Sequence, residues 1–185
     1  MLTVVVAFVL IRLWLVAGQT ITALGEAVHD DAFFMSGATN LVSGKWLGSY
    51  SQMTLIKGPF YSMWIATAFA LGIPLLFSEH VLYVVSCGVL VQALSPTLQS
   101  ARIRLALFAV LLLNPASMAE GVMSRVLRDA IYSSLPLLVL GTALGLAFRQ
   151  DRPFRSILPW VLGLGASLAA YYLCRENVSG CFRRC

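Results

Sequence analysis

Six long apolar segments are separated by polar breaks along this chain, and the first of these breaks is a long loop. A helix that crosses the hydrocarbon core of a membrane needs about 20 mainly apolar residues, so these segments predict transmembrane helices. Glycine, proline and charged residues separate the segments and helix formers fill them, which favours helices over the alternating strands of a barrel. The segments lie at residues 2–17, 59–77, 80–98, 105–119, 130–148 and 156–173.

Simple alternation of six spans places Arg102 and Arg104 on the same side of the membrane as the long loop 18–58. That contradicts the tendency of short cytoplasmic loops to be rich in Lys and Arg. If 59–77 lies along the membrane surface or re-enters, both arginines become cytoplasmic, as does the basic break 149–155. The prolines of 59–77 make it a poor uninterrupted span. We therefore expect an all-α polytopic bundle of five or six membrane segments, with loop 18–58 outside.

Composition supports a membrane protein and excludes several other classes. The chain is 59% hydrophobic and 11% charged, with a mean hydropathy of +0.83, which a soluble domain of 185 residues has no means to bury. The net charge of +5 comes from arginines and lysines that mostly flank apolar segments, which indicates anchoring at the membrane interface rather than nucleic-acid binding. We expect one helical domain over 1–173 and a polar, basic tail over 174–185.

Two adjacent carboxylates, Asp30 and Asp31, lie in the long loop that follows the first apolar segment. An ionised Asp near the bilayer centre costs ~2.5–3.5 kcal/mol, so acids in such chains lie where water or function keeps them. The same loop carries His29, Lys45 and Lys57, together with aromatic residues and glycines. This density of charge predicts an active-site loop over 18–58.

The acidic pair also predicts local structure. Asp30 or Asp31 can begin a helix, because a carboxylate stabilises the free amides of a first turn. Phe34 and Ala38 follow at helical spacing, and Gly44 is placed to end the helix. An amphipathic surface helix with a capping Asp and no chemistry is the alternative interpretation.

Several other residues receive structural interpretations. Arg12 lies within the first apolar segment and either reaches the membrane interface or faces the bundle interior. Glu79 and His80 lie at a segment boundary and are interpreted as interface residues. The cysteines near the C-terminus have no nearby histidine with which to complete a zinc site.

Three motifs resemble the first outer loop and a later element of GT-C-type integral membrane glycosyltransferases, which are relatives of the protein O-mannosyltransferases and the lipid A aminoarabinose transferases. The resemblance covers roughly residues 1–150, and a Lys-Gly-Pro element stands where relatives commonly have His-Pro-Pro. The motifs are His29-Asp30-Asp31-Ala32-Phe33-Phe34, Gly44-Lys45-Trp46-Leu47-Gly48 with Lys57-Gly58-Pro59, and Arg125-x-x-Arg128-Asp129.

The resemblance implies transfer of a sugar from a polyprenyl-phosphate donor at the outer face, with an acid of the first loop acting at the acceptor. Carried over by position, Asp30 or Asp31 is the catalytic base, and Asp129 assists at the acceptor. Lys57, Arg125 and Arg128 contact the phosphate, and His29, Lys45 and Trp46 complete the substrate-binding residues. Inversion at the anomeric carbon follows from a single displacement. The resemblance implies no definite cofactor and leaves a divalent metal ion open, and it does not specify the sugar or the acceptor.

Family members are usually far longer, so we expect this chain to be a fragment, a truncated product or a short member. A non-catalytic membrane subunit that binds lipid or a partner is therefore one alternative. A small transporter, with the acids and arginines along a pathway, is another. The expected location is a bacterial inner membrane.

Overall fold

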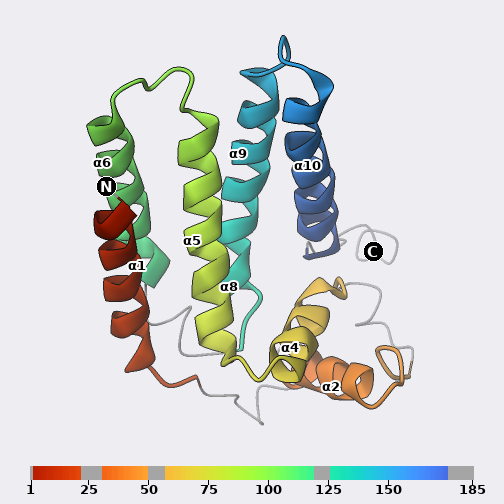
Figure 1. Ribbon diagram of the computed structural model, residues 1–185. Helices are drawn as coiled ribbons and strands as arrows, with labels where there is room; N and C mark the ends of the chain where they lie inside the picture. The colour runs from red at the N-terminus through yellow and green to blue at the C-terminus, as the bar shows by residue number, and fades with distance from the viewer. Residues whose placement is uncertain (1, 22–30, 50–56, 119–125, 175–185) are drawn as a thin grey trace, which may run out of the picture.

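The computed structural model describes residues 2–21, 31–49, 57–118 and 126–174. All regular structure in these residues is helical (Figure 1). Helices α1, α5, α6, α9 and α10 stand side by side, whereas α2 and α4 pack on each other across one end of the bundle. The bounds are α1 Leu2–Ala17, α2 Asp31–Val42, α4 Phe60–Ala70, α5 Leu75–Ala93, α6 Ala101–Leu112, η1 Pro115–Met118, α8 Asp129–Tyr132, α9 Ser134–Ala147 and α10 Phe154–Cys174.

Three helical stretches are long and apolar enough to cross a membrane. They are Leu75–Ala93, Asp129–Ala147, in which α8 runs into α9, and Phe154–Cys174. Helices α1 and α4 are apolar but shorter. The all-helical fold expected from the sequence is therefore confirmed for the described residues. The three candidate spans support a membrane protein, whereas five or six membrane segments stay a prediction.

Helix α5 occupies the centre of the bundle and packs closely against α9, which in turn packs against α10. Glycines allow this close approach. A Cβ atom on Gly141 would lie 3.0 Å from the backbone of Leu90, and one on Gly145 would overlap the ring of Trp160. In a membrane the tails of lipids are as apolar as leucine, so such close backbone packing is a main source of helix association.

The second and third apolar segments divide at a different place from the one expected. The break lies at residues 71–74, because Gly72 takes a φ of +67° and ends α4 in a Schellman motif. Its N–H donates to the carbonyl of Phe69, and that of Ile73 donates to the carbonyl of Ala68. Pro74 then directly precedes α5. The polar residues 78–80 consequently lie inside α5 rather than between two segments.

Helix α2 agrees with its prediction. It begins at Asp31, and Gly44 lies just beyond its end with a φ of +73°. Phe34 and Ala38 are its buried apolar side chains. The amphipathic pattern of the loop therefore places one face of α2 against the protein.

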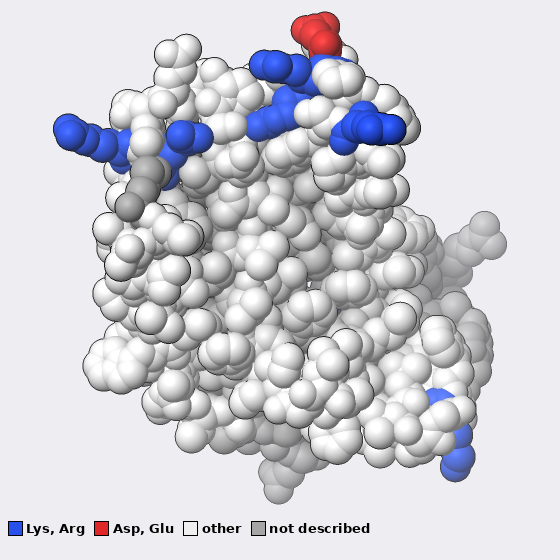
Figure 2. All heavy atoms as spheres, viewed as in Figure 1, with Lys and Arg blue, Asp and Glu red and all other residues white. Residues whose placement is uncertain are grey.

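Positive charge gathers at the end of the bundle opposite α2 and α4 (Figure 2). The basic residues of this end come from the start of α6 and from the turn between α9 and α10, and they are Arg102, Arg104, Arg149, Arg152 and Arg155. We call it the basic end. Both basic breaks thus lie at one end of the bundle, opposite α2 and α4, as in the sequence interpretation that lays residues 59–77 along the surface.

Candidate functional site

The candidate site lies where α2 and α4 meet the end of the bundle. Asp31, the first residue of α2, has an exposed fraction of 0%. At this position its carboxylate lies at the positive end of the helix dipole. A carboxylate removed from water in this way needs polar or charged partners. Ionisable groups in such surroundings are candidates for a functional site.

Lys57 brings a second charge from the segment just before α4. Only 6% of its surface is exposed. Its ammonium nitrogen lies 5.7 Å from the ring centroid of Phe34 and 5.9 Å from that of Phe33. These distances suit cation–π contacts, which are stronger when the cation is removed from water. The two aromatic side chains of α2 thus hold a buried cation at the site.

Tyr61 of α4 connects this layer to the bundle. Its ring packs edge-on against Phe34, with centroids 5.0 Å apart. Its hydroxyl donates a 2.8 Å hydrogen bond to Oε1 of Glu79 in α5, and both side chains are buried. Burial raises the pKa of Tyr61 well above its ordinary value, and the nearby carboxyls of Glu79 and Asp31 raise it further. The phenol therefore stays protonated and serves as a donor.

The later predicted element reaches the same region. Phe34 and Tyr61 share one hydrophobic core with Val126, Ile131 and Cys174. Cys174 lies close enough to Tyr61, Arg128 and Asp129 to interact with each of them electrostatically. The first loop and the residues around α8 therefore meet around Tyr61 and Cys174.

The structure treats the residues predicted for the site in different ways. Asp31 and Lys57 are both buried, Arg128 is half-buried before α8, and Asp129 is exposed at the start of α8. Lys45 and Trp46 are exposed beyond the end of α2. His29, Asp30 and Arg125 lie outside the described residues.

Neither Tyr61 nor Glu79 is among the site residues expected from the sequence. Glu79 is 3% exposed and accepts the hydrogen bond from Tyr61, so its interpretation as an interface residue was wrong. An acidic residue five positions into an apolar helix is a signal of function or pairing. That signal would have been visible if the break had been set at Pro74.

Arg12 belongs to a second buried cluster at the end of α1. Its guanidinium donates to Nδ1 of His80, to Oγ and O of Ser117, and to the carbonyl of Leu112 near the C-terminus of α6. It also lies over the ring of Tyr83, 4.3 Å from the centroid. With 1% exposure, Arg12 faces the bundle interior. Its contacts connect α1 to α5, α6 and η1, which indicates a structural role. His80, also 1% exposed, was likewise wrongly interpreted as an interface residue.

The chemistry open to the site is that of a carboxylate and nearby cations in a region of low water content. A carboxylate can take a proton from an attacking hydroxyl or amine, and Lys or Arg can neutralise a phosphate. Among the residues that the structure describes, no group of three His, Cys, Asp or Glu side chains is placed to hold a metal ion.

Replacing Tyr61 with Phe should lower the free energy of unfolding by about 1–3 kcal/mol, because it leaves the buried carboxyl of Glu79 without this donor. The measurement is thermal unfolding in detergent. Tyr172→Phe is the matched control, since Tyr172 is 65% exposed. Equal melting temperatures for the two variants would contradict the importance of the Tyr61–Glu79 bond.

Comparisons of the chain with protein-family models, with characterised proteins and with solved structures found no match.

Proposed function

We propose that this chain is a membrane glycosyltransferase that takes its sugar from a polyprenyl-phosphate donor at the end formed by α2, α4 and α8. The observation that carries this proposal is the burial of two opposite charges, Asp31 and Lys57, against the Phe34–Tyr61 pair. Burying a charge is costly unless polar or charged partners compensate it, and this chain has few charged residues. A site that binds a charged phosphate and removes a proton uses both.

The proposal includes a membrane arrangement. Helices α1 and α6 pack against α5. In the proposed arrangement they complete a bundle of five membrane segments, and α2 and α4 lie at the membrane surface. Because short cytoplasmic loops are rich in Lys and Arg, the basic end faces the cytoplasm. Loop 18–58 and the site then face outward, across a bacterial inner membrane.

The proposed reaction is a single displacement. Asp31, or Asp30 beside it, removes the proton of the acceptor hydroxyl or amine as that atom attacks the anomeric carbon. The bond from this carbon to the phosphate oxygen breaks, and its electron pair stays on the polyprenyl phosphate. Lys57 and Arg128 neutralise the phosphate as its charge grows, and Asp129 holds the acceptor. The product has inverted configuration at the anomeric carbon.

A non-catalytic membrane subunit is the second candidate. The complete burial of Asp31 favours it, because a carboxylate with no exposed surface also suits a structural helix terminus. This candidate retains polyprenyl phosphate or a partner and releases no product.

Donor binding is tested with Lys57→Gln, titrated with undecaprenyl phosphate in detergent and followed by intact-mass spectrometry. Loss of one charge-assisted contact should weaken retention about 10–100-fold. Arg102→Gln, at the basic end, should retain the lipid as the wild type does, and circular dichroism checks that both variants are helical. Unchanged retention by Lys57→Gln would remove Lys57 from the phosphate site.

A further inference from the structure

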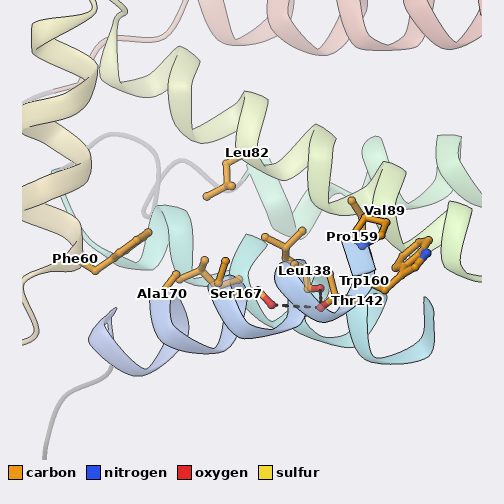
Figure 3. Close-up of a pocket in the computed structure, with 12 residues that line it drawn as sticks. Phe60, Leu82, Val89, Leu138, Thr142, Pro159, Trp160, Ser167 and Ala170 are labelled. Atoms are coloured by element: carbon orange, nitrogen blue, oxygen red, sulfur yellow. Dashed lines mark hydrogen bonds between the residues drawn. The ribbon is translucent and has the colours of Figure 1, made fainter. Parts of the chain in front are cut away.

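A groove with a volume of about 500 Å³ runs between α5, α9 and α10. Figure 3 shows Phe60 at one end of it and Trp160 toward the other. Its two hydroxyl groups, on Thr142 and Ser167, lie 3.2 Å apart and hydrogen-bond to each other. Its other lining side chains are apolar, and they include Leu82, Val89, Leu138, Pro159 and Ala170. A groove of this chemistry within a membrane bundle accommodates a hydrocarbon chain.

The lining of the groove follows one face of α10, and that face continues to the basic end. Pro159, Gly163, Ala166 and Ala170 line the groove at intervals of three or four residues. Residues spaced in this way lie on the same side of a helix. Arg155 stands four residues before Pro159, so it occupies the next turn of the same face.

The groove therefore leads to exposed positive charge. Arg155 and Arg152, which lies in the turn just before α10, are both exposed. Phe154 between them is 72% exposed, an arrangement typical of a segment at the membrane interface. The two cations suit the phosphate of a lipid headgroup, and the apolar groove suits its acyl chain.

Arg149 fixes the basic end of the groove. Its guanidinium lies 4.5 Å from the ring centroid of Trp160, which lines the groove. It donates to the carbonyls of Gln92 and Ala93, at the C-terminal end of α5, and to that of Gly145 in α9. Arg149 thereby joins the two helices that flank the groove and holds Trp160 in place.

We propose that this groove binds one acyl chain of an anionic phospholipid from the leaflet at the basic end, with Arg152 and Arg155 at the headgroup phosphate. The proposed headgroup position is separate from the transfer site, because the arginines lie at the basic end and α2 and α4 lie at the other end of the bundle. Cytoplasmic leaflets carry anionic lipids, and each Lys or Arg near them adds to the attraction. The bound lipid fills a space that helix packing leaves open.

The experiment offers the detergent-solubilised protein an equal mixture of phosphatidylglycerol and phosphatidylcholine of the same chain length, and measures the retained lipid by intact-mass spectrometry. The wild type should retain phosphatidylglycerol preferentially. Arg152→Gln/Arg155→Gln should lower that preference at least fivefold, whereas Arg102→Gln, which removes an exposed cation at the start of α6, should leave it unchanged.

Ala166→Trp fills the groove and should lower retention of both phospholipids, whereas Leu162→Trp is its control, because Leu162 is 63% exposed and does not line the groove. Equal retention of the two lipids by the wild type would overturn the proposal, as would normal retention by Ala166→Trp. A third outcome would also overturn the proposal: added undecaprenyl phosphate displaces phosphatidylglycerol, and of these variants only Ala166→Trp prevents its retention. The groove would then hold the polyprenyl lipid rather than a phospholipid of the leaflet at the basic end.

Discussion

Replacing Asp31 with Asn should reduce sugar transfer by about 10²–10⁴-fold, the contribution that a positioned general base makes to such a reaction. Asn keeps the size of the side chain but cannot take the acceptor's proton. Asn is nearly isosteric with Asp and can also accept hydrogen bonds at the start of a helix, so α2 should persist. The measurement is the rate of transfer from a radiolabelled polyprenyl-phosphate hexose in membranes that contain the acceptor.

Asp151→Asn is the matched control, because Asp151 is an exposed acid in the turn between α9 and α10, at the basic end. It should transfer sugar at the wild-type rate. Asp30→Asn, measured beside Asp31→Asn, decides which member of the pair is the base. A double variant of Asp30 and Asp31 with full activity would exclude a catalytic role for both.

Replacing Arg12 with Met should lower the free energy of unfolding by about 3 kcal/mol or more. The change leaves the carbonyls of Leu112 and Ser117 and Nδ1 of His80 without this buried donor, at about 1–3 kcal/mol each. Removing the buried guanidinium also removes the cost of taking it out of water. We expect this gain in stability to be smaller than the loss, because the polar partners of Arg12 remain buried without a donor. For a chain of this size the loss corresponds to a fall of about 6–12 °C in melting temperature.

Arg102→Met is the control for this measurement, since Arg102 is exposed at the start of α6. Arg12→Lys should recover only part of the stability, because an ammonium cannot reproduce the planar fork that reaches α5, α6 and η1 together. An Arg12→Met protein that melts with the wild type would show that the cluster does not hold the bundle.

The sequence was sufficient for helix α2 because its signals are local. The carboxylate at the first turn, the spacing of Phe34 and Ala38, and Gly44 beyond the end act within a few residues of one another. The membrane class followed just as directly from hydropathy. Both predictions needed no knowledge of what lies across the bundle.

The division between α4 and α5 was predicted wrongly because two signals competed. Residues 78–80 are polar and looked like a break, whereas the real break uses the positive φ of Gly72 and the proline that starts α5. Polar residues are stable inside α5 only because tertiary partners meet them. Tyr61 from α4 meets Glu79, and Arg12 from α1 meets His80.

The same reason limits prediction of the candidate site. Asp31 and Lys57 were selected from the sequence as charges in an unusual loop, but their burial against Phe34 depends on how α2 and α4 pack. Lys45 and Trp46 belong to the same run of residues and yet remain exposed. The sequence pattern alone does not distinguish the residues that become buried from those that stay exposed.

The most direct test of the central claim is the intact-mass spectrum of the protein purified with its native lipids. The proposed function predicts a specifically retained polyprenyl-phosphate sugar, which loses the mass of the sugar when acceptor-containing membranes are added. Retention of phospholipid alone, with no polyprenyl-phosphate species at any loading, would contradict a transferase and leave a non-catalytic membrane subunit.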